Sequence, residues 1–326
     1  MDLTCARPHL LAAALSAMLL IAGCGPGPPE LLPPNSLAFG VFGDGPYFFW
    51  ENGRFGRVLS DAAESDVSWL IHVGDILESP CSDAVYQKRF EQLRSVPYPV
   101  VYTPGDNEWT DCHGRLQGNY DPLDREAGLR RIFFTDPHLS LGAAPMKLNP
   151  QSNRAGFNEF VENARWYAGG LVFATLHIVG SSNGLDSFDG RTSELDDEVR
   201  RRTEADLAWI DEAFEAARGM SAWGVVLAFH GDMGFLPEES SRGFEAIIDR
   251  LRVQVETFGG QVLLVHGDSH EYIVDHPLTD ETGRTYESVT RLETFGSPDI
   301  GWVRVVADTL AGSFTAFEPR SMKGWW

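Results

Sequence analysis

The sequence of 326 residues is poor in basic residues and in cysteine. Its 26 Lys and Arg face 47 Asp and Glu, which gives a formal net charge of −21. A chain with this charge repels a polyphosphate backbone and an anionic lipid surface, which argues against nucleic acid as a partner. Most of the acidic excess fits an ordinary solvated surface, and cation binding is easy to accommodate.

Long apolar runs are also lacking, apart from residues 10–22, and this run is shorter than a membrane span. Its position after Arg7 is typical of a signal-peptide core that is removed on export. The run closes in Leu20-Ile21-Ala22-Gly23-Cys24, which resembles the bacterial lipobox, where the cysteine is lipidated before cleavage. We expect residues 1–23 to be a lipoprotein signal peptide. The alternative is an ordinary secretory peptide with a chance cysteine.

On this interpretation Cys24 carries the lipid, and the lipid is the protein's only contact with the membrane of the cell envelope, at its periplasmic or outer-membrane face. Residues 24–36 are rich in proline and glycine, a composition that favours an extended tether. We expect the folded domain to span residues 37–326, as one large α/β core without internal repeats.

Four cysteines leave little choice of disulfide pairing. Cys5 is removed with the signal peptide and Cys24 carries lipid, so the exported domain keeps Cys81 and Cys112. An oxidising compartment favours a disulfide between them. It would tie together two loops at one end of the sheet.

The first half of the domain alternates short apolar runs with helix-like stretches, a β-α-β-α-β pattern. The predicted strands are 37–42, 69–73 and 100–102, and the predicted helices are 56–64, 84–93 and 123–133. Two alternating runs, 157–166 and 171–178, predict a hairpin turning at Gly169-Gly170.

The second half continues with a helix at 198–218, strands at 225–229 and 262–265, and a helix at 244–255. Short alternating runs at 289–295, 302–306 and 313–317 favour antiparallel strands that finish a second sheet. The whole pattern predicts an α/β fold of mixed sheets with outer helices.

Five predicted strands end in glycine-containing motifs that carry Asp or His. In open α/β sheets the carboxyl ends of strands form the binding crevice, and glycine lets the chain turn sharply there. Carboxylates that meet in one crevice repel one another unless a cation neutralises them. The mixed set suits zinc, manganese, iron or magnesium better than calcium. The candidate metal ligands are Asp44, Asp75, Asp106, His230, Asp268 and His270.

This ordered series of motifs resembles the calcineurin-like metallophosphoesterases over nearly all of residues 37–317. The resemblance implies an α/β/β/α sandwich of two mixed sheets flanked by helices, holding two divalent metal ions. Asp44 matches the family's first aspartate, Asp75 the aspartate that bridges both metals, and His230 the lone histidine. His270 matches the last histidine of the final motif.

Four positions depart from the family pattern. Pro46 stands where the first motif has histidine, so the first metal site loses a ligand and is expected to be weak. Asp106 replaces a metal-binding asparagine, Asn107 the catalytic histidine, and Asp268 a metal-binding histidine. Asp106 and Asp268 keep metal-ligand chemistry, which favours an atypical subgroup over a decayed copy.

Other polar residues near the motifs are candidates for supporting roles. His266 is an extra ligand, a partner of the ligands or a structural histidine. Asn107, His113 and Arg115 are the candidate catalytic residues, with His113 as proton donor and Arg115 as phosphate contact. Asn183 is a weaker candidate for a substrate contact. We assign no role to His72, His138, His177 and His276.

The function that the resemblance implies is hydrolysis of a phosphate ester outside the cytoplasm, by attack of metal-bound hydroxide on phosphorus. An alternative is a lipoprotein that keeps the fold but has little or no activity and serves in binding or as a scaffold; Pro46 and Asn107 favour it. A solute-binding lipoprotein fits the anchor, but it leaves the converging aspartates and histidines unexplained.

Overall fold

The computed structural model describes residues 33–322 except 78 and 236–240. The predicted signal peptide, the lipidation site at Cys24 and most of the predicted tether therefore lie outside the described residues. Within the described part, no helix is both long and apolar enough to cross a membrane.

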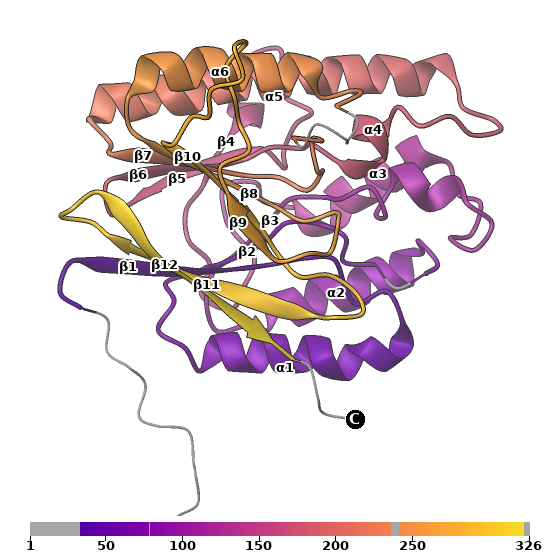
Figure 1. Cartoon of the computed structure of the whole chain (residues 1–326). Coiled ribbons are helices and arrows are strands. Elements are labelled where there is room, and N and C mark those ends of the chain that lie inside the picture. The colour runs from indigo at the N-terminus through magenta and orange to yellow at the C-terminus, as the bar shows by residue number, and fades with distance from the viewer. Residues whose placement is uncertain (1–32, 78, 236–240, 323–326) are drawn as a thin grey trace, which may run out of the picture. The chain divides into compact units, whose positions relative to one another are not determined.

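The first sheet has five strands in the order β12-β11-β1-β2-β3 (Figure 1). Strands β1 (Ser36–Phe42), β2 (Leu70–His72) and β3 (Val100–Tyr102) run parallel to one another. Strands β11 (Gly301–Asp308) and β12 (Ser313–Ser321) form an antiparallel pair whose β11 member lies beside β1. All residues of β2 and β3 are buried, as expected for parallel strands covered on both faces.

The second sheet has seven strands in the order β4-β5-β6-β7-β8-β10-β9. Four central strands run parallel: β6 (Leu171–Thr175), β7 (Gly224–Ala228), β8 (Gln261–His266) and β10 (Val289–Glu293). The outer strands β4 (Asn149–Pro150), β5 (Ala164–Ala168) and β9 (Ile273–Asp275) are antiparallel to their neighbours.

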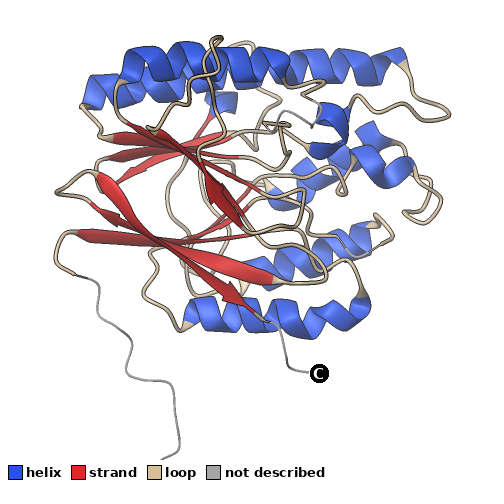
Figure 2. Ribbon diagram, in the orientation of Figure 1, coloured by secondary structure: helices blue, strands red, loops and turns tan. Residues whose placement is uncertain are grey.

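The two sheets pack face to face, and helices cover their outer faces (Figure 2). Helices α1 (Asn52–Ala63), α2 (Asp83–Arg94) and α3 (Pro122–Phe133) share a core with the five-stranded sheet. Helices α5 (Ser193–Met220) and α6 (Glu245–Phe258) cover the seven-stranded sheet. Between the sheets lies a separate core that includes Phe39, Val41, Phe173, Leu263 and Val303. The expected α/β fold of two mixed sheets flanked by helices is confirmed.

Helix ends follow local sequence signals. The side chain of Ser82 accepts a hydrogen bond from the backbone N–H of Val85 at the start of α2. Asp121 accepts two such bonds at the start of α3. Pro122 occupies the first helical position, where its lack of an N–H costs no hydrogen bond within the helix. Short 3-10 turns η1 (Phe49–Glu51), η2 (Thr110–His113) and η3 (Gln151–Asn153) occur in the loops.

Two sequence predictions about strands were wrong. Only residues 164–168 of the region around the predicted 157–166 strand form β5, because residues before it fold into turns, with the N–H of Phe160 bonded to the carbonyl of Phe157 at 3.1 Å. The side chains of Glu162 and Asn163, which follow these turns, are both buried in a polar network. They do not alternate between the two faces of a strand.

The last three predicted strands also do not finish one antiparallel sheet. β10 joins the second sheet parallel to β8, whereas β11 and β12 return to the first sheet beside β1. A strand's alternation of apolar and polar residues sets which face is buried, but it does not choose the neighbouring strand.

Candidate metal centre

Six predicted ligands come together where strands of both sheets end. Asp44, Asp75 and Asp106 follow β1, β2 and β3, while His230 follows β7 and both Asp268 and His270 follow β8. The five-stranded sheet thus supplies three carboxylates, and the seven-stranded sheet supplies the remaining three side chains.

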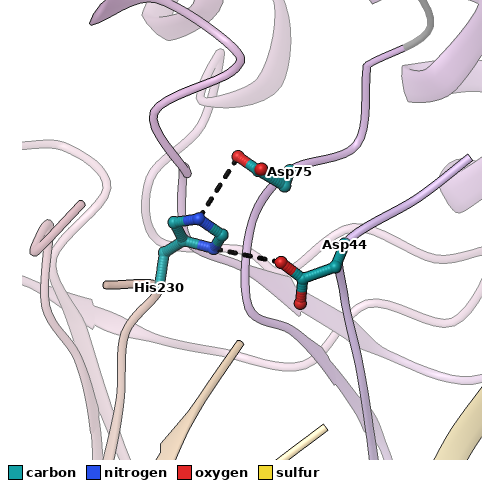
Figure 3. Close-up of side chains that lie close together, drawn as sticks. All are labelled: Asp44, Asp75 and His230. Atoms are coloured by element: carbon teal, nitrogen blue, oxygen red, sulfur yellow. Dashed lines mark ion pairs between the residues drawn. The ribbon is translucent and has the colours of Figure 1, made fainter. Parts of the chain in front are cut away.

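The imidazole of His230 lies at the centre of this group, between Asp44 and Asp75 (Figure 3). Its Nε2 is 3.0 Å from Oδ1 of Asp106, 3.3 Å from Oδ1 of Asp75 and 3.8 Å from Oδ1 of Asp268. Its Nδ1 is 2.9 Å from the carbonyl oxygen of Val73. Because a carbonyl can only accept, Nδ1 carries a proton, and Nε2 faces the carboxylates, the arrangement typical of metal-binding histidines.

Glycines let the loops approach closely enough to bring these carboxylates together. A Cβ at Gly105 would lie 2.1 Å from Oδ1 of Asp75, and a Cβ at Gly267 would lie 2.0 Å from Oδ2 of Asp44. Any side chain at these two positions would collide with a carboxylate of the neighbouring loop. The glycines that precede Asp106 and Asp268 are therefore required by packing.

Four of the six residues have backbone conformations that are unfavourable for side chains other than glycine. The φ angles are 52° at Asp44, 57° at Asp75, 82° at Asp268 and 68° at His270. Such strain persists only where the surroundings hold it, and it gathers at functional sites. Here backbone hydrogen bonds hold the strained loops. The N–H of Asp44 donates to the backbone carbonyl of Gly74, and the N–H of Gly45 donates to the backbone carbonyl of Asp75.

Burial and crowding shape the ionisation of the cluster. Burial, with help from nearby carboxylates, raises the pKa of Asp44 to about 7 and that of Asp268 to about 6, and it raises the pKa of Asp75 well above its usual range. Burial acts the same way on Asp106, but hydrogen bonds from His230 and Ser181 outweigh it and lower its pKa.

His230 shows the opposite balance. Burial alone would lower the pKa of its imidazole, yet the surrounding carboxylates raise it well above its ordinary value. Among the described residues, the ion pairs of the four carboxylates are with His230 and His270. The cluster therefore attracts positive charge, and none of these ion pairs includes a Lys or Arg.

The donor set fits divalent metal ions. Asp44, Asp75 and His230 form one group of ligand atoms close enough to share an ion, and Asp106, His230 and Asp268 form a second. Oδ2 of Asp44 is buried without a hydrogen-bond partner, a costly arrangement that a cation would relieve. Mixed carboxylate and imidazole donors suit zinc and similar metals.

His270 lies beside this group, and the backbone carbonyl of Ser297 fixes its ring. Its Nδ1 donates to the carbonyl of Ser297 at 2.8 Å, which leaves Nε2 facing Asp44 at 3.8 Å. The hydroxyl of Tyr47 is 3.1 Å from the same Nε2 and donates to Oδ2 of Asp75 at 2.5 Å. Tyr47 was not among the site residues predicted from the sequence, although it follows Asp44 by only three positions.

Glu108 was also missed, and it organises two of the ligand loops. Its buried carboxylate accepts hydrogen bonds from the N–H groups of Asp75, Ile76 and Gly105 at 2.8 to 3.2 Å. A signal was present in the sequence, because Glu108 follows the candidate ligand Asp106 by only two positions.

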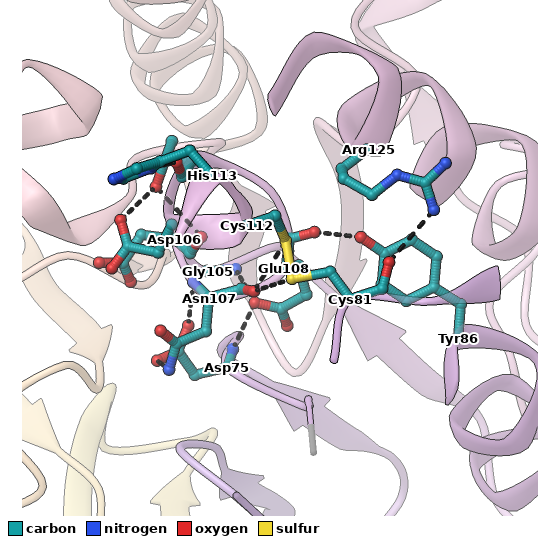
Figure 4. The surroundings of a disulfide bond; sticks show 12 residues. Asp75, Cys81, Tyr86, Gly105, Asp106, Asn107, Glu108, Cys112, His113 and Arg125 are labelled. Atoms are coloured by element: carbon teal, nitrogen blue, oxygen red, sulfur yellow. Dashed lines mark hydrogen bonds between the residues drawn. A yellow bond between two sulfur atoms is a disulfide. The ribbon is translucent and has the colours of Figure 1, made fainter. Parts of the chain in front are cut away.

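The predicted disulfide is confirmed, and it lies beside the loop that contains Glu108 (Figure 4). Cys81 and Cys112 are joined with their Cα atoms 5.8 Å apart. Asn107 lies between the disulfide and the candidate ligand Asp75, and its side-chain amide donates to Oδ2 of Asp75 at 2.7 Å. Its backbone N–H donates to Oδ1 of the same carboxylate at 3.1 Å. Asn107 thus orients Asp75.

A cavity of about 340 Å³ opens next to the cluster. Ser181 lines it and donates to Oδ2 of Asp106 at 2.7 Å, so one hydroxyl links the cavity to a candidate ligand. His113 also lines the cavity, with its ring stacked on Phe188 at 3.6 Å between centroids. Its Nδ1 lies 2.8 Å from the carbonyl of Thr110.

The turn that carries Ser181 has an unusual backbone. In α4 (Gly180–Gly184), three successive residues from 181 to 183 have left-handed conformations with φ between 52° and 56°. Arg202 holds the turn by donating to the side chain of Asn183 at 2.5 Å and to its carbonyl at 2.9 Å. The side chain of Asn183 is buried in these contacts, which gives it a structural role in place of the predicted substrate contact.

Two other candidates belong neither to the ligand groups nor to the cavity wall of the described residues. His266 is buried, stacked on Phe229, and outside both ligand groups of the described residues; burial lowers its pKa to about 4. Arg115 is exposed, and it is not among the described residues that line the cavity.

A second buried group consists of Glu126, Glu162 and His177. Arg130 lies 2.9 Å from the carboxylate of Glu126 and 2.6 Å from that of Glu162, so its guanidinium pairs with both. Burial raises the pKa of Glu126 to about 8, which favours its neutral form. Nδ1 of His177 is 2.7 Å from the carboxylate of Glu162. This group is a salt-bridge network, in which His177 has a structural role.

Comparison with known proteins adds little to this geometry. No family model matches the chain, and no curated protein matches it. Among solved structures, the chain is similar to the protein TT1561 of Thermus thermophilus, with 12% identity and a TM-score of 0.42. The match covers 86% of this chain and 97% of that one.

Proposed function

We propose that this protein is a metal-dependent phosphoesterase of the calcineurin-like metallophosphoesterase family, in an atypical subgroup. The observation that carries the proposal is the convergence of four carboxylates on the single imidazole of His230, at the ends of strands from two sheets. The order of these residues along the chain is the one that the family's motifs have.

The residues divide into two ligand sets that share one member. On the order of the family's motifs, Asp44, Asp75 and His270 would hold one divalent cation, and Asp75, Asp106, His230 and Asp268 the other. His230, which lies within reach of both groups of ligand atoms, is assigned to the second cation. When bound, such cations neutralise the charge of phosphoryl oxygens and lower the pKa of a water molecule. The metal identity among zinc, manganese, iron and magnesium is set by donor chemistry and supply, and Asp106 and Asp268 give the second set extra negative charge.

The chain's other residues position these groups and the substrate. Asn107 and Glu108 orient Asp75, and carbonyl oxygens fix the rings of His230 and His270. The cavity beside Asp106 would take the alcohol part of the ester. His113, on its wall, is the candidate proton donor to the departing oxygen.

We also propose that the protein acts outside the cytoplasm, anchored by lipid on Cys24. The Cys81–Cys112 disulfide supports export, because structural disulfides are rare in reducing compartments. The anchor itself rests on the lipobox resemblance at residues 20–24.

A second candidate function is a binding or scaffold lipoprotein that keeps the fold and one metal but has little or no turnover. The position of Asn107 favours it, because this amide stands at the family's catalytic histidine and is engaged with Asp75. An amide cannot serve as a general acid near neutral pH.

Hydrolysis of an aryl phosphate, measured with added Mn²⁺ or Zn²⁺, separates these functions. The phosphoesterase predicts metal-dependent turnover that Asp75→Asn abolishes, because Asp75 belongs to both ligand sets. Metal binding without turnover would favour the scaffold. Undiminished hydrolysis in Asp75→Asn would sink the assignment of the metal site.

A further inference from the structure

The first motif lacks the family's histidine, yet the structure places another donor beside the same ligands. Tyr47 follows Pro46 directly, and its side chain turns toward the cluster, with its ring in an edge-to-face contact with His270. Its hydroxyl reaches both Asp75, at 2.5 Å, and Nε2 of His270, at 3.1 Å.

We propose that Tyr47 is an oxygen ligand of the first metal site and takes the place of the missing histidine. This inference rests on the proposed function, since it assumes that Asp44, Asp75 and His270 hold a cation. With Tyr47 the first set has four donors from four different side chains. The first site is then complete, contrary to the weakness that the sequence indicates.

The spacing of the donor atoms supports this role. Ligands bonded at about 2.0 to 2.1 Å around one cation lie about 3 Å from one another. The hydroxyl of Tyr47 is 3.1 Å from Nε2 of His270, and that nitrogen is 3.8 Å from Oδ1 of Asp44. The first separation is that of two ligands on one shared cation, and the second is somewhat longer.

The loop that carries Tyr47 is anchored to the same residue that fixes His270. Glu51 accepts hydrogen bonds from the N–H of Tyr47 at 2.8 Å and from the hydroxyl of Ser297 at 2.7 Å. The carbonyl of Ser297 accepts a hydrogen bond from Nδ1 of His270. The backbone N–H of Ser297 donates to the carbonyl of Asp44 at 2.8 Å. Supporting bonds of this kind hold metal ligands in a fixed geometry.

A hydrogen bond from a neutral phenol to Asp75 would also explain the short contact, so the test must distinguish a ligand from a positioning residue. Tyr47→Phe removes only the hydroxyl and keeps the ring that packs on His270. Tyr167→Phe is the matched control, because Tyr167 lies on β5 and is 43% exposed. Thermal melts check that both variants fold.

The probe is Zn²⁺ alone, added to chelator-treated protein while binding isotherms and ultraviolet difference spectra are recorded. The wild type and Tyr167→Phe are expected to bind two Zn²⁺ per chain and to develop phenolate absorption. Tyr47→Phe is expected to lose that absorption and to bind one of the two ions at least about 10- to 100-fold more weakly.

The inference is overturned if Tyr47→Phe keeps both affinities. It is also overturned if the wild type shows no phenolate signal, whatever the affinities, since that is the behaviour of a hydrogen-bonded phenol. In both cases a wild type that binds two Zn²⁺ and hydrolyses esters leaves the proposed function standing. A wild type that binds no Zn²⁺ contradicts the inference and the proposed function together.

Discussion

The hydroxyl of Ser181 donates a hydrogen bond to Oδ2 of Asp106 at 2.7 Å and so joins the cavity wall to the carboxylate cluster. The same hydroxyl lies 3.1 Å from Oδ1 of Asp111, a second residue of the cavity wall. A molecule bound in the cavity therefore lies next to the candidate metal ligands, and the residues around it are open to direct tests.

His113→Ala should slow hydrolysis mainly for esters with poor leaving groups. A proton donor matters in proportion to how badly the departing oxygen needs a proton, and its loss typically costs a factor of about 10² to 10⁴. Aryl oxygens need it little, so rates on aryl and alkyl phosphates should separate. Equal losses on both substrates would reject the role of His113 as acid.

Asp206→Asn should flatten the pH dependence of stability. Burial raises the pKa of Asp206 from 3.8 to about 7, so the folded state holds its proton more tightly than the unfolded state does. The wild type therefore loses stability as the pH rises from about 4 through 7, by about 3 to 4 kcal/mol from this group.

Asparagine keeps an oxygen that can accept from Asn163 and from the N–H of His177, as Oδ1 of Asp206 does. It has no charge to bury, so this contribution to the slope should vanish. Urea denaturation of both proteins across the range from acid to mildly alkaline pH measures the slope. Parallel curves of unfolding free energy against pH would contradict the burial argument.

Replacing both disulfide cysteines should destabilise the protein by about 2 to 4 kcal/mol in the chain-entropy model. The bridge joins residues 31 positions apart, so it restricts the unfolded chain considerably. Denaturant midpoints of the Cys81→Ser, Cys112→Ser double variant test this value. Thiol labelling of unreduced, denatured wild type should find neither cysteine reactive, and labelling of both would disprove the bridge.

Cys24→Ser should release the protein from membranes while the fold is kept. The small residues before Cys24 are the basis for this prediction, and several acyl chains at about 0.8 kcal/mol per buried methylene account for the anchoring. Membrane fractionation after a high-salt wash measures the release. A variant that stays membrane-bound would show that the lipobox interpretation is wrong.

The convergence of the candidate metal ligands could be predicted from sequence because each lies at the end of a strand-like run. Parallel strands bring their carboxyl ends to one edge, so Asp44, Asp75 and Asp106 had to be neighbours once the β-α pattern was recognised. Tyr47 could not be found this way. It opens the aromatic run Tyr47-Phe48-Phe49-Trp50, which looks like core, whereas Phe49 and Trp50 are 72% and 61% exposed.

The left-handed turn at residues 181–183 could also not be predicted from the sequence. It contains two serines and an asparagine where glycine would be expected, and it is held by Arg202 from a distant helix. Tertiary contacts override local preference there. The same holds for residues 157–163, where the buried carboxylate of Glu162 pairs with Arg130.

The most direct test of the central claim is the metal content of protein purified without chelator, measured together with Asp75→Asn purified in the same way. The account predicts two divalent ions per chain in the wild type and a loss of bound metal in the variant, because Asp75 belongs to both ligand sets. A wild type without metal, which also fails to bind added Zn²⁺ or Mn²⁺, would contradict the account.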